Sequence, residues 1–108
     1  MKIITLHTRI NPDELREHIR QNIDKMFREQ RNEVMHFDVE GSENMIEIFQ
    51  RDLYEGFLFR IEVKGFELDI TRSEHYVDDV NSLTVESILN ELFNDLSGKL
   101  GTDLLLEG

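Results

Sequence analysis

The chain has 108 residues, of which 39% are hydrophobic and 32% charged, and it contains no cysteine. This composition fits one globular domain over residues 1–108 and excludes disulfide and thiolate chemistry. The formal net charge is -11, so the protein repels phosphate backbones and favours basic partners over nucleic acid.

Residues 2–10 alternate between two faces, with Ile4, Leu6, Thr8 and Ile10 on one of them, and predict a first strand. The apolar stretch is interrupted by polar residues, and no small-residue cleavage site follows it. We therefore expect no signal peptide. No apolar run is long enough to span a bilayer, and we expect a cytoplasmic protein.

A helix is predicted from Asn11, which is suited to the N-cap, and Pro12, which is suited to the first helical position. It is expected to end near Asn32. Its apolar residues recur at helical spacing, so one face should be buried. They are Leu15, Ile19, Ile23, Met26 and Phe27.

Four alternating segments then predict a meander of two hairpins. A loop over 41–44 joins 34–40 to 45–50, and a two-residue turn at Lys64-Gly65 joins the next two strands. These turns set the expected registers. The expected pairs are Glu40 with Met45, Asp38 with Glu47, His36 with Phe49, Ile48 with Phe59, Val63 with Phe66, and Phe57 with Arg72.

A second helix follows residues 73–82, and the segment after it, DLLLEG, is expected to pack, to pair with a sheet edge or to fray. Glycines at 98 and 101 are expected to interrupt this helix. Its apolar residues form a single stripe. They are Val85, Ile88, Leu89, Leu92, Phe93, Leu96 and Leu100.

The element order β-α-β-β-β-β-α predicts an α+β two-layer sandwich, with a mainly antiparallel sheet and both helices on its apolar face. The first strand is expected to lie parallel to a neighbour through a right-handed crossover. The opposite sheet face then stays open to solvent or to a partner. The segment that contains the meander, residues 33–79, carries thirteen acidic and four basic side chains.

The open face is our candidate partner-binding site. The predicted registers place like charges side by side, which destabilises a sheet unless solvent screens them or a basic partner covers them. They also gather apolar side chains, which mark contact surfaces, including dimer surfaces, unless another segment covers them. The predicted binding residues are Asp38, Met45, Glu47, Phe49, Leu58, Arg60, Glu62, Glu67 and Asp69.

Catalytic and metal-binding motifs are not found in the sequence. Ser73, Glu74 and His75 are consecutive, so they cannot converge as nucleophile, base and orienting group. His36, with Asp38, Glu47 and Asp69, could share a patch, but their spacing matches no metal-site motif. We expect a non-enzymatic protein without a cofactor or a metal.

The order of strand, capped helix, meander and helix looks like that of ribosome hibernation factors, and part of it is similar to a double-stranded RNA-binding domain. The resemblance implies RNA contacted by basic surfaces. Here the second helix carries Glu86, Glu91 and Asp95, with only Lys99 near its end. This departure removes side chains that would meet phosphate, and no site residue is carried over.

We therefore expect a small domain that binds a protein partner, basic in character, or forms a homodimer through the open face, without direct nucleic-acid or membrane binding. Two alternatives stay open. One is a nucleic-acid mimic, whose carboxylates occupy a DNA- or RNA-binding protein. The other is a ribosome- or RNA-associated factor that uses arginines of the first helix, namely Arg16, Arg20, Arg28 and Arg31.

Overall fold

The structure is a computed structural model that describes residues 2–6, 9–76, 78–99 and 104–107. The elements follow the predicted order, with one short helix and one strand in addition. In chain order they are β1 (Lys2–Leu6), α1 (Pro12–Arg31), β2 (Asp38–Glu40), β3 (Met45–Phe49), β4 (Phe57–Lys64), β5 (Glu67–Arg72), η1 (Glu74–Tyr76), α2 (Val80–Lys99) and β6 (Leu104–Glu107).

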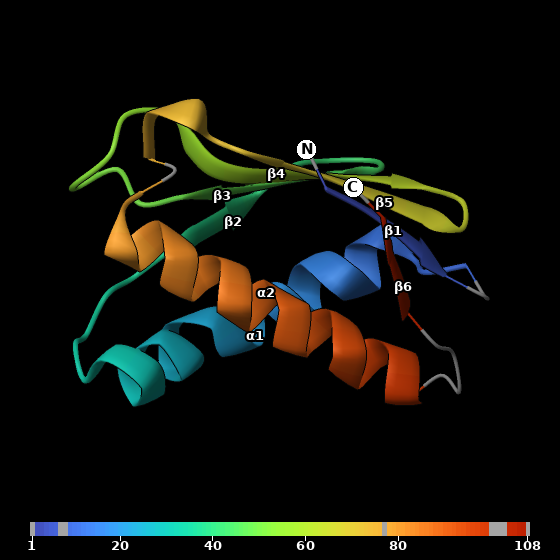
Figure 1. Cartoon of the computed structure of the whole chain (residues 1–108), viewed down its shortest axis with the longest axis horizontal. Helices are drawn as coiled ribbons and strands as arrows, with labels where there is room; N and C mark the ends of the chain where they lie inside the picture. Colours follow the sequence, from blue (N-terminus) through green and yellow to red (C-terminus); the bar gives the residue numbers. More distant parts are fainter. Residues whose placement is uncertain (1, 7–8, 77, 100–103, 108) are drawn as a thin grey trace.

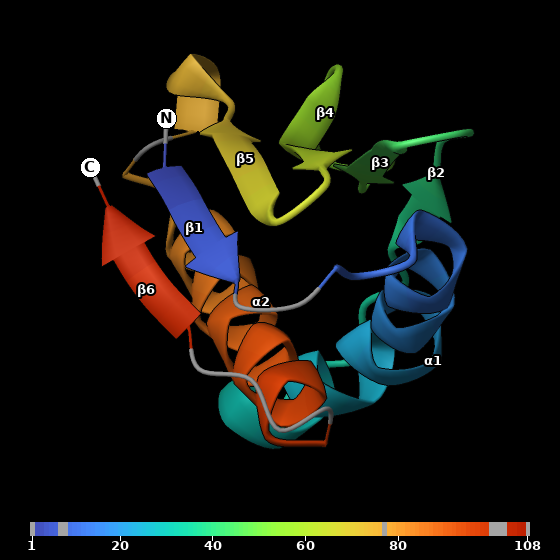
Figure 2. The same ribbon diagram turned by 90° about the vertical axis from the view of Figure 1, so that its right-hand side faces the viewer.

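The strands form one six-stranded sheet in the order β2-β3-β4-β5-β1-β6. Every neighbouring pair is antiparallel. Both helices lie below the sheet in Figure 1, and the sheet curves around α2 in Figure 2. The predicted α+β class is confirmed, and of the fates expected for the last segment, pairing with an edge is the one observed.

The predicted parallel neighbour of β1 is wrong. β1 lies between β5 and β6 and is antiparallel to both. It runs in the same direction as β2, but three strands separate the two. A helix of 20 residues is about 30 Å long, so α1 can carry the chain under the sheet to its far edge. The preference for a right-handed crossover applies to parallel strands that are neighbours in the sheet. Here the other strands of the meander lie between β1 and β2.

The ends of α1 are the predicted ones. The Asn11 side chain accepts hydrogen bonds from the backbone N–H groups of Asp13 (2.8 Å) and Glu14 (3.2 Å). At the other end, Asn32 adopts a left-handed conformation with φ of 56° and donates its backbone N–H to Arg28. The helix is thus capped by side chain and backbone at the positions read from the sequence.

The second helix begins at Val80 because Asp79 caps it. The Asp79 carboxylate accepts a hydrogen bond of 3.0 Å from the Ser82 backbone N–H. The helix continues through Gly98 to Lys99, so the glycine expected to interrupt it does not. The side chains of Leu96 and Leu100, two members of the predicted stripe, lie outside the described residues.

The core lies between the helices and the lower sheet face. Leu15, Ile19, Ile23 and Phe27 of α1 are fully buried, while Met26 is partly buried. From α2, Val85, Ile88, Leu89, Leu92 and Phe93 are buried as predicted. Together with the sheet residues Ile46, Ile48, Ile61, Leu68 and Ile70, they form one hydrophobic cluster.

The predicted registers are right for β3–β4 and shifted by two residues in both hairpins. Glu40 pairs with Glu47, and Lys64 pairs with Glu67. The second turn is therefore Gly65-Phe66, with φ of 62° at Gly65, as a type II′ turn requires at its first central position. A shift of two keeps the paired strand residues on their predicted faces, but it moves Phe66, predicted opposite Val63, into the turn, where it is 47% exposed.

A β-bulge in β4 changes the face of two residues. Ile48 pairs with Phe59, but Phe49 pairs with Phe57, so Leu58 is the extra residue. Leu58 is fully buried instead of facing the open side, and its carbonyl accepts a hydrogen bond from the Ser73 N–H. Phe57, predicted in the core, shares the open face with its partner Phe49.

Candidate binding face

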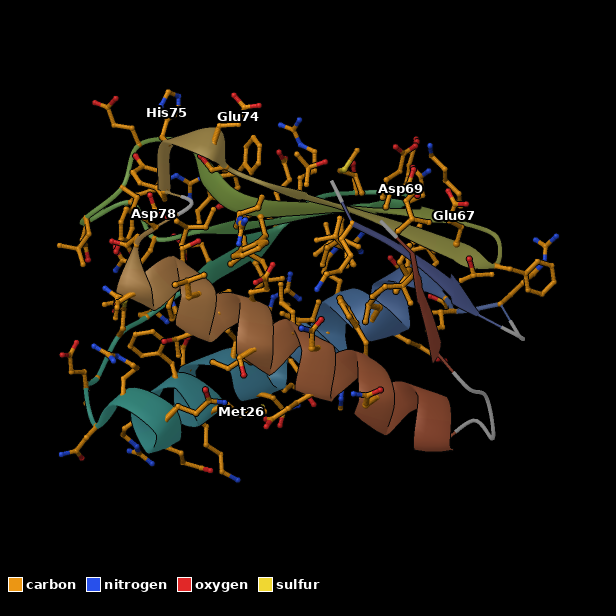
Figure 3. All side chains as sticks on the ribbon, in the orientation of Figure 1. Met26, Glu67, Asp69, Glu74, His75 and Asp78 are labelled. Atoms are coloured by element: carbon orange, nitrogen blue, oxygen red, sulfur yellow. The ribbon has the colours of Figure 1, made fainter. Side chains whose placement is uncertain are left out.

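The face of the sheet opposite the helices is the candidate site, called the open face below. Its side chains follow from the observed registers and the two-residue period of a strand. They are Asp38, Glu40, Met45, Glu47, Phe49, Phe57, Arg60, Glu62, Lys64, Glu67, Asp69, Thr71, Ile3 and Thr5. Figure 3 shows Glu67 and Asp69 projecting from β5 on the side away from the helices.

The cross-strand rows differ from the predicted ones. One row is Glu40, Glu47, Arg60 and Thr71, and the next is Met45, Glu62 and Asp69. Asp38 faces Phe49 instead of Glu47. The predicted Asp38–Glu47 and Glu62–Glu67 contacts are replaced by Glu40 opposite Glu47 and Glu62 opposite Asp69. Like charges still face one another.

Arg51, from the β3–β4 loop, reaches back over the end of the open face. Its guanidinium lies 4.0 Å from the centroid of the Phe49 ring and donates to both carboxylate oxygens of Glu40, at 2.7 and 3.1 Å. A third contact of 3.2 Å reaches Asp38. The hydrogen bond from Arg51 lowers the pKa of Glu40, which keeps this exposed carboxylate charged.

Arg60 makes a similar arrangement in the middle of the face. Its guanidinium lies 4.3 Å from the centroid of the Phe57 ring and 2.9 Å from the carboxylate of Glu47. Phe49 and Phe57 are both half-buried. Each aromatic ring of the open face therefore has an arginine stacked on it, and each arginine is held by a carboxylate.

Lys64 pairs with carboxylates at the other end of the face. Its ammonium group lies 2.7 Å from Asp69 and 3.8 Å from Glu62. Hydrogen bonds with Glu67 and then with Lys64 lower the pKa of Asp69, and the bond to Asp69 raises the pKa of Lys64.

The predicted contact patch of Phe49, Leu58 and Met45 is wrong, because the three side chains do not lie together on the open face. Leu58 is in the core and contributes nothing to the surface. Met45 is half-buried and lies in the row with Glu62, away from Phe49. Phe57 takes the place of Leu58, so the aromatic part of the face is the facing pair Phe49 and Phe57.

His36 does not assemble a metal site. Its Nδ1 is 2.7 Å from Asp24 on α1, and its Nε2 is 3.4 Å from Asp38. Glu47 and Asp69 belong to the other clusters described above. Among the residues that the structure describes, no three histidine, cysteine, aspartate or glutamate side chains are placed to hold a metal ion.

A cleft of about 610 Å³ lies at the end of the open face, beside Phe57. Its other lining residues come from the β3–β4 loop and from η1 and the residue before it, namely Glu55, Gly56, Ser73, His75 and Tyr76. Figure 3 shows Glu74, His75 and Asp78 gathered at this end. Ser73 and His75 both line the cleft, but in this described region no hydrogen bond joins their side chains. The expectation of a non-enzymatic protein stays a prediction.

Of the four arginines proposed for RNA contact, Arg16 and Arg20 form hydrogen bonds within the fold. Arg16 is buried and donates to the carbonyls of Glu43 and Met45, both at 3.1 Å. Arg20 donates to the Val39 carbonyl at 2.8 Å and pairs with Glu17 at 2.6 Å. Arg28 and Arg31 lie exposed in the last turn of α1. The four do not form one basic surface.

Sequence reasoning missed Arg51, the exposure of Phe57 and the cleft. The acidic residues at 38 and 40 could have suggested a partner for Arg51, which is the second residue after β3. In the apolar run Phe57-Leu58-Phe59, either Phe57 or Leu58 could face the core. The sequence pattern therefore does not show that a bulge is present. The cleft depends on a loop and a short helix that no periodicity predicts.

Comparison with known proteins finds no match to this chain among family models, curated proteins or solved structures. Of the helices that the structure describes, none combines the length and the apolar character that a bilayer span requires.

Proposed function

We propose that this protein is a small non-enzymatic binding domain whose open face recognises a basic segment of a protein partner. The observation that carries the proposal is the composition of that face. Its described side chains include six carboxylates, and with Arg51 they include three cations. The carboxylates are Asp38, Glu40, Glu47, Glu62, Glu67 and Asp69; the cations are Arg51, Arg60 and Lys64.

The accessibility of the face supports this use. Both helices lie on the other side of the sheet (Figure 1). Glu62 retains 38% side-chain exposure and Arg60 43%. The surplus of negative charge steers basic partners toward the face, and the rings of Phe49 and Phe57 offer apolar area at close range. Aromatic and arginine side chains are the types that most often carry binding energy in interfaces.

A nucleic-acid mimic is a weaker account of the same face. A mimic needs a continuous acidic surface, and here the three cations are interleaved with the carboxylates. Direct RNA binding is weaker still, because Arg16 and Arg20 are bonded to the hairpin β2–β3. The proposal includes a cytosolic location, with which the absence of cysteine accords.

Charge reversal on the open face tests the proposal. A fluorescein-labelled peptide that alternates arginine with glycine serves as the basic probe, and fluorescence anisotropy measures its affinity. The double variant Glu62→Lys, Glu67→Lys is expected to bind the peptide at least about tenfold more weakly, because two attractions become repulsions. The loss should shrink as ionic strength rises.

The matched control is Glu29→Lys, Glu91→Lys, which makes the same change in net charge on exposed positions of the two helices. It should reduce affinity much less. Equal losses in both double variants would show that the peptide senses only total charge, and would contradict a site on the open face. The milder pair Glu62→Gln, Glu67→Gln gives the answer if the lysine variant does not fold.

A further inference from the structure

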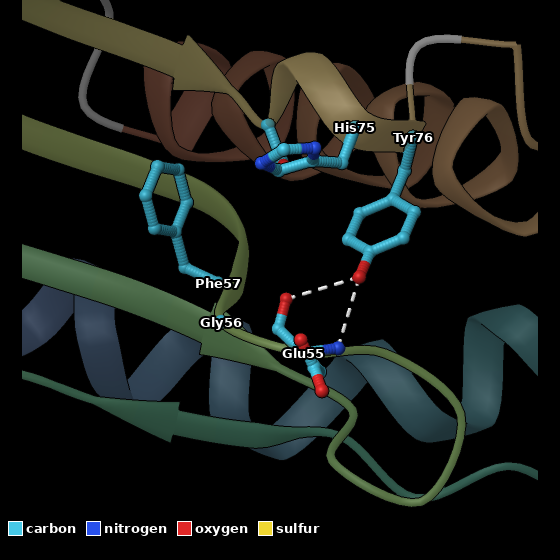
Figure 4. Close-up of a pocket in the computed structure, with 6 residues that line it drawn as sticks. Glu55, Gly56, Phe57, His75 and Tyr76 are labelled. Carbon is cyan, nitrogen blue, oxygen red and sulfur yellow. Dashed lines mark hydrogen bonds between the residues drawn. The ribbon is translucent and has the colours of Figure 1, made fainter.

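The cleft at the end of the open face has aromatic walls and an acidic rim. Figure 4 shows the rings of Phe57 and Tyr76 on opposite sides of it, with the His75 ring between them and Glu55 below. The lining brings β4 together with the β3–β4 loop and η1. A volume of about 610 Å³ accommodates one long side chain with part of its backbone.

The walls of the cleft are held in place by hydrogen bonds. The Tyr76 hydroxyl accepts from the Glu55 backbone N–H at 2.9 Å and donates to the Glu55 carbonyl at 3.1 Å. The Tyr54 ring packs edge-on against Tyr76, with centroids 4.7 Å apart, and its hydroxyl donates to Asp79 at 2.7 Å. The loop and η1 are thus tied together before any ligand binds, which lowers the entropic cost of binding.

The charge around the cleft favours a cation. Segments 50–56, 73–76 and 78–79, which flank it, carry five carboxylates against one guanidinium. The neighbouring Arg60 and Arg72 are already paired, with Glu47 at 2.9 Å and Glu86 at 3.4 Å. Arg60 also shows that the Phe57 ring accepts a guanidinium on one face, and Figure 4 places this ring at the wall of the cleft.

We infer that this cleft is the anchor site for a single cationic side chain, arginine or lysine, of a basic protein segment. Its aliphatic stem would pack between the Phe57 and Tyr76 rings, and its charged end would meet the Glu55 carboxylate. The inference rests on the proposed function and adds to it a position on the partner where a basic residue matters most.

The test uses small probes, so that it does not depend on the partner. N-acetyl-arginine amide and N-acetyl-lysine amide are titrated into the ¹⁵N-labelled protein, with N-acetyl-citrulline amide as a neutral analogue of arginine. The cationic probes should shift the amide signals of Glu55, Gly56, Ser73 and His75 in a saturable way. Citrulline should bind roughly threefold to tenfold more weakly, since it lacks the charge that the rings and the carboxylate attract.

Two variants locate the effect. Glu55→Gln and Phe57→Leu should each weaken binding of the cationic probes severalfold, while Glu91→Gln on α2 should leave it unchanged. Equal shifts with arginine and citrulline, shifts that avoid the cleft, or no saturable shift at all would overturn the inference. The dispersion of amide signals shows whether each variant is folded, and Phe57→Ile replaces Phe57→Leu if it is not.

The two experiments distinguish an error in the anchor site from an error in the proposed function. If the open-face charge reversal weakens the basic peptide but arginine amide does not reach the cleft, the anchor site is wrong and the binding face stands. If arginine amide binds in the cleft while the charge reversal leaves the peptide affinity unchanged, the binding face is wrong.

Discussion

The guanidinium of Arg16 is a buried charge that joins α1 to the loop between β2 and β3. Its side chain is only 10% exposed, and it pairs with Asp13 at 2.6 Å. It also donates to two backbone carbonyls, that of Glu43 in the loop and that of Met45 at the start of β3. Removing the guanidinium would leave these carbonyls without their charged hydrogen-bond donor. The loop could then rearrange.

We predict that Arg16→Met, which keeps the apolar stem, lowers the free energy of unfolding by about 1.5–3 kcal/mol. Urea denaturation followed by circular dichroism measures the change. Arg31→Met, at an exposed position of the last turn of α1, is the control and should cost less than about 0.5 kcal/mol. Equal costs for the two variants would mean that Arg16 is not a structural link.

His36 is an exposed residue that bridges α1 and β2. The hydrogen bond with Asp24 and the charge of Asp24 raise the pKa of His36, and Asp38 adds to this. A pKa raised in the folded state means that protonation stabilises the fold. The contribution is complete below the unfolded pKa near 6.5 and is lost as the pH rises through the higher folded value.

The stability difference between the wild type and His36→Gln should therefore be larger at pH 5.5 than at pH 8.5. Chemical denaturation at both pH values measures it, at low ionic strength because the group is exposed. The same comparison in an Asp24→Asn background should show a much weaker pH dependence. A difference that is constant with pH, or that grows toward pH 8.5, would refute the role of protonated His36.

At the scale of elements, the bulge in β4 decides which side chains reach the open face. It turns Leu58 into the core and brings Phe57 beside Phe49 and Arg60. Bulges commonly re-aim side chains near functional sites. Both the aromatic pair on the face and one wall of the cleft depend on this single extra residue.

We predict that Leu58→Ala destabilises the protein by about 2–5 kcal/mol, as expected for a fully buried leucine. Phe57→Ala should cost less than about 1.5 kcal/mol, because its ring is only partly buried. Thermal and urea unfolding of the two variants compare them directly. The reverse order of costs would place Leu58 on the surface and remove the bulge.

The elements and their faces were predictable because their signals are local. Asn11 and Asn32 mark the ends of α1, and the buried stripe from Leu15 to Phe27 follows from helical spacing. The β3–β4 register was also predicted correctly, through the pairing of Ile46 with Ile61. Apolar periodicity contains this information without any knowledge of the tertiary structure.

The hairpin registers and the candidate site were less predictable. Shifts of two residues preserve the pattern of buried and exposed positions, so only turn geometry distinguishes them. The positive φ of Gly65 at the first position of its turn is such a case. The bulge at Leu58 and the stacking of Arg51 on Phe49 depend on contacts between segments, which the sequence alone does not reveal.

On the scale of the whole molecule, the sheet divides the protein into an apolar half, closed by two helices, and a charged face. The described part of that face carries six carboxylates, so two copies placed face to face would bring many like charges together. Such repulsion acts against a homodimer through this face. It leaves the face available for a partner of opposite charge.

We accordingly predict a monomer in solution at low and at high salt, measured by light scattering on protein without an affinity tag. High salt screens the repulsion between copies, so it is the more demanding condition. A dimer at both salt concentrations would assign Phe49 and Phe57, or a sheet edge, to self-association. That result would count against the face as a site for a basic partner.

The NMR footprint of the arginine–glycine peptide on the ¹⁵N-labelled protein would locate the binding site residue by residue. We expect shifts of amide signals in β3, β4 and β5, at Met45–Phe49, Phe57–Lys64 and Glu67–Arg72, together with the residues of the cleft. Shifts confined to the outer surfaces of α1 and α2, around Glu29 and Glu91, would contradict the claim that the open face is the binding site.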